Sequence, residues 1–147
     1  MSQIDAFLKH RDIAVIGISR EKGKFGNSAA SMLVDKGYRV HLVHPIMKTF
    51  EGLTVVSSVE QLAPEVKACL LVVPPTETEK LIPTLAAQGI ENVWLQQGAE
   101  SDTARALCDQ HRINCISGEC IFMFAEPVSG IHKWHRWIWR LLGKLPN

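Results

Sequence analysis

Short apolar runs alternate along this chain with segments of helical character, and this alternation limits the fold more than any other feature of the sequence. The first run is rich in β-branched residues, and short apolar runs of this kind favour buried strands. They cover residues 13–18, 39–43, 67–73, 92–95 and 113–116, and a brief extended piece is predicted at 53–56. Helices are predicted at 27–36, 76–88 and 101–111, with a shorter one near 59–62.

Strands that alternate with helices of about ten residues need crossover connections, which produce a parallel sheet with helices on both faces. We therefore expect an α/β fold, a Rossmann-like three-layer domain around a mostly parallel sheet of about five strands. The chain has 147 residues, 46% of them hydrophobic, which suits one domain over 1–147. Ligands bind such sheets at the carboxyl ends of the strands, where the strand order reverses. The loops that matter are then 17–27, 44–48, 73–76 and 96–100.

The loop after the first predicted strand has the features of a phosphate-binding loop. Gly17 follows the strand directly, so the backbone can turn tightly and approach a ligand. The loop leads into a helix, whose first N–H groups are unpaired and attract anions. It carries three cations, Arg20, Lys22 and Lys24, although the formal net charge of the whole chain is only +1. The alternative is a flexible turn whose lysines only keep the chain soluble.

Two observations disfavour NAD as the ligand. The dinucleotide fingerprint Gly-x-Gly-x-x-Gly needs glycine at position 19, where the chain has Ser19. An NAD site also needs an acidic residue after the second strand for the ribose hydroxyls. Here that strand runs into His44 and Pro45, and Lys48 lies just beyond. A neutral or basic site tolerates an additional phosphate on the ribose, and both NADP and coenzyme A carry one.

Two further loops place rigid and polar groups at the same edge of the predicted sheet. The third strand ends in Val73, Pro74 and Pro75. The two prolines form a rigid apolar wall without N–H donors, on which an adenine ring or a pantetheine chain can lie. The alternative is that Pro75 simply begins a helix. After the fourth strand come Gln97 and Gly98, where the amide can bond a pantetheine amide or a substrate carbonyl, or remain solvated.

Taken in order, these loops resemble the CoA-binding domain family, which includes stand-alone bacterial proteins and the N-terminal domain of the succinyl-CoA synthetase α subunit. In the synthetase the first loop has a glycine, a hydroxyl residue two positions later, a further glycine and a phenylalanine. The matching residues here are Gly17, Ser19, Gly23 and Phe25. The later loops match at Pro45 with Lys48, Val73 with Pro74, Gln97 with Gly98, and the turn Gly118-Glu119-Cys120. Ile46 and Met47 separate the proline from the lysine, and the resemblance covers roughly residues 12–124.

The resemblance implies that coenzyme A, or an acyl-CoA, binds across these loops with Ser19, Arg20 and Lys22 near its phosphates. The candidate binding residues are Gly17, Ile18, Ser19, Arg20, Lys22, Lys24, Phe25, His44, Pro45, Lys48, Val73, Pro74, Pro75, Gln97 and Gly98. The synthetase's phosphorylated histidine lies in a second domain outside the resemblance, so we expect a binding or regulatory module without catalysis of its own. Two alternatives stay open: an NADP-dependent oxidoreductase or other nucleotide-binding enzyme, and a protein-interaction module.

The histidines and cysteines do not form a pattern typical of catalysis or of a metal site. None of the six histidines pairs with a serine or cysteine in a nucleophile motif. His111, Cys115 and Cys120 have poor spacing for zinc. Residues 1–13 lack the apolar core of a signal peptide, and no stretch of about 18 apolar residues could span a membrane. We therefore expect a cytoplasmic chain with free thiols, and its nearly neutral charge gives no indication of a nucleic-acid partner.

The C-terminal segment 131–143 is predicted to be an amphipathic helix rich in tryptophan. Its apolar face carries Ile131, Trp134, Ile138, Leu141 and Leu142, and its basic face carries Lys133, Arg136 and Arg140. We expect this helix to dock on its own domain or on a twin subunit, the latter giving a homodimer. A membrane surface is the alternative, since basic side chains and tryptophans suit it.

Overall fold

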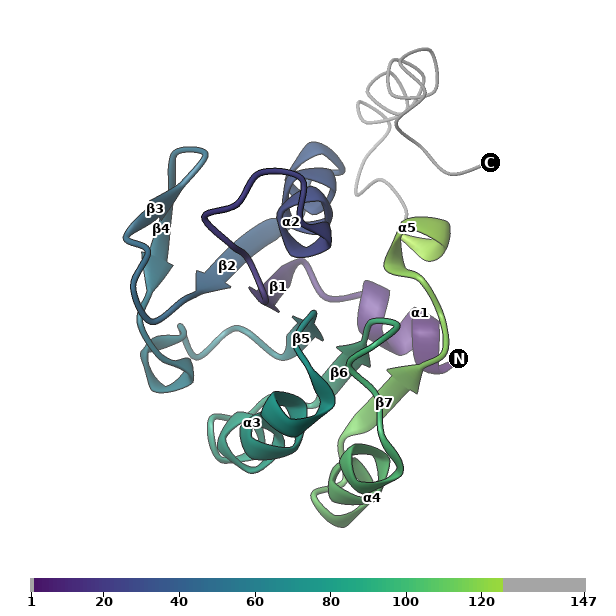
Figure 1. The fold of residues 1–147 in the computed structure, drawn as a ribbon. Helices are drawn as coiled ribbons and strands as arrows, with labels where there is room; N and C mark the ends of the chain where they lie inside the picture. The colour runs from purple at the N-terminus through teal and green to yellow at the C-terminus, as the bar shows by residue number, and fades with distance from the viewer. Residues whose placement is uncertain (1, 126–147) are drawn as a thin grey trace.

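The computed structural model describes residues 2–125 and shows a seven-stranded sheet between two layers of helices (Figure 1). The strands are β1 (Asp12–Ile16), β2 (Arg39–Val43), β3 (Thr49–Phe50), β4 (Leu53–Val56), β5 (Ala68–Leu71), β6 (Asn92–Leu95) and β7 (Asn114–Ser117). The helices are α1 (Gln3–Leu8), α2 (Phe25–Asp35), the 3-10 helix η1 (Val59–Gln61), α3 (Pro75–Ala87), α4 (Asp102–Gln110) and α5 (Ile121–Phe124). The helix predicted at 131–143 lies outside the described residues.

The strand order is β3-β4-β2-β1-β5-β6-β7, and every pair is parallel except β3 with β4. The chain runs outward from β1 through β2 to β4 and then returns to the other side of β1 with β5. The strand order therefore reverses between β1 and β5, which is where such sheets bind ligands. The predicted α/β class and Rossmann-like arrangement are confirmed.

The predicted number of about five strands is wrong, because the sheet has seven. One additional strand is β4, which the sequence suggested only as an extended piece. The other is β3, which is two residues long and so has no readable alternation. It returns antiparallel to β4 through Glu51 and Gly52, whose φ angles of 47° and 82° suit a tight hairpin turn.

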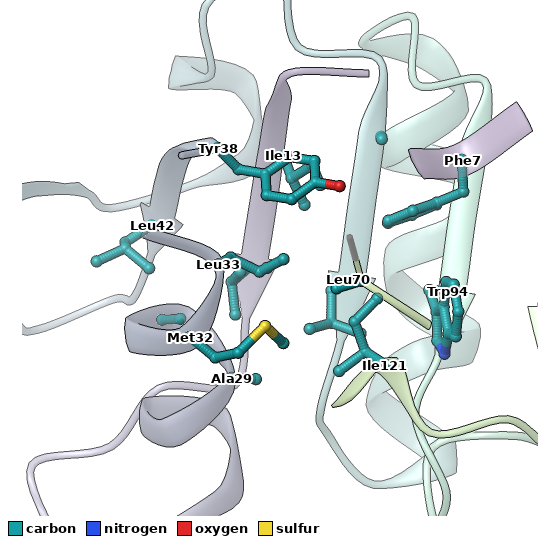
Figure 2. Close-up of a cluster of buried hydrophobic side chains, with 14 of the residues drawn as sticks. Phe7, Ile13, Ala29, Met32, Leu33, Tyr38, Leu42, Leu70, Trp94 and Ile121 are labelled. Carbon is teal, nitrogen blue, oxygen red and sulfur yellow. The ribbon is translucent and has the colours of Figure 1, made fainter. Parts of the chain in front are cut away.

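Helices α1, α2 and α5 cover one face of the sheet, and α3, α4 and η1 cover the other (Figure 1). Figure 2 shows the core of the first face, where Trp94 of β6 is fully buried. The ring of Phe7 from α1 meets it edge-on with centroids 5.3 Å apart. The indole N–H of Trp94 donates to the carbonyl of Glu119 at 2.9 Å, and so fixes the turn that leads into α5.

An ionic cluster joins the amino ends of β1 and β2, at the edge of the sheet opposite the predicted site. Asp12 accepts hydrogen bonds from Arg39 at 2.9 and 2.7 Å and lies 2.9 Å from the Nε2 of His41. The hydrogen bond from Arg39 is the main reason why the pKa of Asp12 falls to about 2. The ionised carboxylate therefore stabilises the fold.

We expect Asp12→Asn to reduce the free energy of unfolding at neutral pH by about 1 kcal/mol, because Arg39 is largely exposed and its charge is screened. The folded pKa of Asp12 lies below its ordinary value of 3.8. The stabilisation is therefore present above about pH 4 and disappears as the pH falls toward 2. Urea titrations of parent and variant across this range measure it. A difference between the two proteins that does not change with pH would contradict the prediction.

Among residues 2–125 no helix is long and apolar enough to cross a membrane. The cysteines Cys69, Cys108, Cys115 and Cys120 form no disulfide in the structure.

Candidate functional site

A cavity of about 420 Å³ lies at the carboxyl edge of the sheet, beside the point where the strand order reverses. Its size falls within the roughly 300–1,000 Å³ of small-molecule sites. Five of the predicted residues line it: Gly17, Ile18, His44, Pro45 and Val73. The rest of the lining is Ile16, Val43, Ser57, Ser58, Val59, Glu60, Glu77, Leu81 and Thr84. The ends of β1 and β2, the segment after β4 and one face of α3 thus form its walls.

A second cavity of about 390 Å³ is lined by Val72, Val73, Pro74, Pro75, Gln97, Gly98 and Ala99. Val73 belongs to both linings, so the two cavities adjoin. Pro74 is the N-cap of α3 and Pro75 is its first residue. The helix-start interpretation is therefore confirmed, and the prolines also line a cavity, while contact with a ligand stays a prediction.

The structure shows a further reason for glycine at position 17, which the sequence alone did not reveal. Its φ is +129°, and a Cβ at this position would lie 2.7 Å from the carbonyl carbon and 2.8 Å from the Cβ of Val72. A Cβ on Gly26, in the first turn of α2, would likewise lie 2.7 Å from the carbonyl carbon of Gly17. Gly17, directly after β1, is therefore packed between the backbone of Val72, directly after β5, and the first turn of α2. Gly26 was not among the predicted site residues.

The side chain of Asn27 holds the loop between β1 and α2 in one conformation. Its Oδ1 accepts from the N–H of Ser19 at 2.8 Å, and its Nδ2 donates to the carbonyls of Ser19 at 2.9 Å and Glu21 at 3.1 Å. The hydroxyl of Ser19 accepts from the N–H of Glu21 at 3.1 Å. Ser19 therefore shapes the loop, and its N–H is already engaged within the protein.

The three predicted cations of this loop are exposed, and they differ in their partners. Lys24 pairs with Glu21 at 3.2 Å. Arg20 and Lys22 take part in none of the ion pairs found within residues 2–125. The N-cap of α2, Lys24, makes no side-chain hydrogen bond to the first turn. Two cations and the positive end of the α2 dipole are therefore available to an anion.

His44 is held in a single tautomer by the loop after β2. Its Nδ1 lies 3.0 Å from the backbone nitrogens of both Ile46 and Met47, whose N–H groups donate to it. A neutral His44 therefore carries its proton on Nε2, and this side chain lines the larger cavity. His44 thus offers a hydrogen-bond donor to an acceptor such as a phosphate oxygen.

The structure does not bring every predicted residue to the cavities. The residues that line neither are Ser19, Arg20, Lys22, Lys24, Phe25 and Lys48. The ring of Phe25 packs edge-on against Phe122 of α5, with centroids 5.1 Å apart. Lys48 is exposed in the loop before β3.

Sequence reasoning missed the residues that reach the larger cavity from outside the four loops. Glu77, Leu81 and Thr84 lie on one face of α3, and their spacing of four and then three residues was a readable signal. The segment after β4 contributes Ser57, Ser58 and Glu60. Only the strand order of the folded sheet places this segment beside the larger cavity. The loop after β2 indeed has no carboxylate, but Glu60 and Glu77 bring carboxylates to the same cavity.

Comparison with known proteins yields one family and several related structures. A family model described as CoA binding domain matches residues 11–126. A conserved hypothetical protein from Pyrococcus furiosus is 32% identical at a TM-score of 0.73, over 76% of this chain and 96% of its own. A protein from Thermus thermophilus is 25% identical at a TM-score of 0.73, over 82% of this chain and 94% of its own.

A likeness in fold alone extends to a dinucleotide-forming acetyl-coenzyme A synthetase 1 of Ca. Korarchaeum cryptofilum, solved with phosphate and ADP. The two chains are 18% identical at a TM-score of 0.66, over 76% of this chain and 26% of the synthetase.

Proposed function

This chain belongs to the CoA binding domain family, as the resemblance of its loops indicates, and from that premise we propose that it binds coenzyme A or an acyl-CoA. The observation that supports the proposal best is the larger cavity at the reversal of strand order, which adjoins a loop where two cations have no ion pair with any other described residue. A nucleotide with several phosphates needs both features. A domain that binds no ligand has no need to place unpaired cations beside a cavity.

The residues at this edge fit the parts of coenzyme A. Adenine is a flat and largely apolar ring, and the larger cavity has apolar walls that include Ile18 and Val43. The diphosphate is an anion, for which Arg20 and Lys22 are available. The pantetheine chain is apolar with two amides, and the smaller cavity combines its prolines with the amide of Gln97.

We further propose that the chain is a binding or regulatory module without catalysis of its own. Among residues 2–125, the linings of the two cavities contain no cysteine, no lysine and a single histidine, His44. The Nδ1 of that histidine is engaged by backbone N–H groups, so it is not available as a base. The cytoplasmic location and the docking of 131–143 on its own domain or on a twin subunit stay predictions from the sequence.

Titration calorimetry with coenzyme A, dephospho-coenzyme A, NADP and NAD tests the ligand. We expect coenzyme A to bind and NAD to bind at least tenfold more weakly, because NAD lacks the ribose phosphate that the donor on His44 and the nearby Lys48 would bind. A tenfold difference corresponds to about 1.4 kcal/mol. Dephospho-coenzyme A lacks the same phosphate and should also bind more weakly than coenzyme A.

The nicotinamide nucleotides provide the outcome that would contradict this assignment. If NAD binds as tightly as coenzyme A, the coenzyme A assignment is wrong. If NADP binds more tightly than coenzyme A, the oxidoreductase alternative is favoured. Glu60 and Glu77 make this comparison necessary, because carboxylates in the cavity are also able to accept hydrogen bonds from ribose hydroxyls.

A further inference from the structure

A chain of hydrogen bonds joins the N-terminal helix α1 to the amino ends of β6 and β7, at the edge of the sheet opposite both cavities (Figure 1). The Nδ2 of Asn114 donates to the backbone carbonyl of Gln3 at 2.9 Å and to the Oδ1 of Asn92 at 2.8 Å. The Nδ2 of Asn92 lies 3.0 Å from the Nε2 of His10, which follows the end of α1 by two residues. Asn92 is buried, and His10 and Asn114 are partly buried.

The backbone carbonyl of Gln3 fixes the direction of every hydrogen bond in this chain. A carbonyl can only accept, so the side-chain group of Asn114 that meets it is the amide nitrogen. The same nitrogen also donates to Asn92, whose oxygen therefore faces Asn114 and whose nitrogen faces His10. The Nε2 of His10 is then an acceptor, and the neutral imidazole carries its proton on Nδ1.

A protonated His10 does not fit this arrangement. The new N–H on Nε2 would point at the N–H of Asn92, 3.0 Å away. Rotation of the imidazole gives no relief, because both ring nitrogens of a protonated histidine are donors. Rotation of the Asn92 amide would turn its nitrogen toward the nitrogen of Asn114, and rotation of both amides would turn an oxygen toward the carbonyl of Gln3. The hydrogen-bond chain is therefore complete only with a neutral His10.

The charges around His10 also favour the neutral ring. Burial is the main cause that lowers the pKa of His10, and the positive charge of Lys9 acts in the same direction. From the neighbouring strands, Glu91 before β6 raises this pKa and Lys67 before β5 lowers it. Because the folded pKa lies below the ordinary value of 6.5, the stabilisation by the neutral ring is present above about pH 6.5. It is lost as the pH falls from there through the folded pKa.

We propose that His10 is a pH-sensitive switch, whose neutral ring holds α1 on the sheet and whose protonation releases the helix. Apart from this network, α1 is held by Phe7, which packs edge-on against the fully buried Trp94 (Figure 2). Release of the helix therefore uncovers an aromatic part of the core. The switch is independent of the proposed ligand, because it lies at the opposite edge of the sheet from both cavities.

Hydrogen exchange of the full chain at pH 8 and pH 5, read by mass spectrometry on a peptide that covers residues 2–10, tests the switch. The parent is compared with His10→Gln at each pH, so that the intrinsic pH dependence of exchange cancels. Glutamine keeps an acceptor oxygen for Asn92 but takes up no proton. We expect equal exchange at pH 8. At pH 5 the parent should exchange about tenfold faster, because a buried donor left unpaired shifts an equilibrium by about this factor.

Two further variants sharpen the test. His111→Gln is the matched control, since His111 is exposed at the C-cap of α4, and it should exchange as the parent does at both pH values. Asn92→Asp places an acceptor in front of His10 and should reverse the pH dependence, with α1 held more tightly at pH 5 than at pH 8.

Three results would overturn the proposal. One is a ratio of parent to His10→Gln exchange that is the same at both pH values. Another is an equal increase in the peptide that covers β1, which would show that the whole domain unfolds. The third needs no variant: nitrogen-15 shifts of the parent that place the proton of the neutral His10 on Nε2. The test therefore stands even if Asn92→Asp fails to fold.

Discussion

Replacement of Arg20 and Lys22 together by alanine should weaken the binding of coenzyme A at least tenfold. Neither side chain has an ion pair within residues 2–125, so both are available to the phosphates of a ligand. A charge-assisted hydrogen bond contributes roughly 1.5–3 kcal/mol, and about 1.4 kcal/mol already corresponds to a factor of ten. Titration calorimetry at two salt concentrations measures the effect. The parent should lose affinity as salt rises, and the variant should lose less.

The matched control is the pair Lys9→Ala and Arg11→Ala. These cations are also exposed, and they lie just before β1, at the opposite edge of the sheet from the loop. The control removes the same total charge and should leave the affinity within about twofold, because exposed charges separated by more than about 10 Å are largely screened. If both pairs weaken binding equally, the effect is one of net charge. If the loop variant binds as the parent does, its cations take no part in binding.

Gly17→Ala should destabilise the fold more than any other single change in the loop, by roughly 3 kcal/mol or more. The new Cβ would overlap the backbone of Val72 at the end of β5, and overpacking of a core typically costs about 1–3 kcal/mol. The φ of +129° adds strain for any residue other than glycine, of about 1–3 kcal/mol. Domains of this size are stable by only about 5–15 kcal/mol. Thermal and urea unfolding measure the loss.

Gly23→Ala separates these two contributions. Gly23 lies in the same loop and also has a positive φ, +84°, but no atom lies within 4 Å of the position of its Cβ. It should therefore show the backbone strain alone, and the excess loss at Gly17 is due to the contact with Val72. Equal losses at the two positions would show that β5 moves aside easily. Because Gly17 supports the fold, its substitution cannot test ligand binding, and the loop cations have to carry that test.

Most strands of the sheet were predicted from the sequence. The errors in where two of them end have a common physical cause. Strands β2, β4 and β6 begin and end at the predicted residues, since turn and proline signals flank them. The strands β1 and β5 end two residues earlier than predicted, at Ile16 and Leu71. The apolar pattern continues beyond them because Ile18 and Val73 pack against the hydrophobic cores and also line the larger cavity. Burial beyond the end of a strand and burial within the sheet require the same residue types.

Tertiary contacts explain what the sequence did not reveal. Helix α1 has only six residues, too few for a readable period, and it is held by the burial of Phe7 against Trp94. Helix α5 has four residues and begins where the N–H of Ile121 donates to the buried amide of Gln96 at 3.2 Å. The four loops were predictable because the strand order follows a general rule. The residues from α3 and from the segment after β4 were not, since they join the cavity only after the chain has folded.

The hydrogen bonds of Asn27 have a consequence for the thermodynamics and kinetics of recognition. Ordering one residue of a mobile loop costs about 1–2 kcal/mol of conformational entropy. Here the Asn27 amide already satisfies Ser19 and Glu21 from within the protein, so this entropy is lost during folding and not during association. The loop backbone is preorganised, while the long side chains of Arg20 and Lys22 keep their rotamer freedom. Binding should therefore proceed without a slow rearrangement of the loop, at a rate set by diffusional encounter and by the ionic strength.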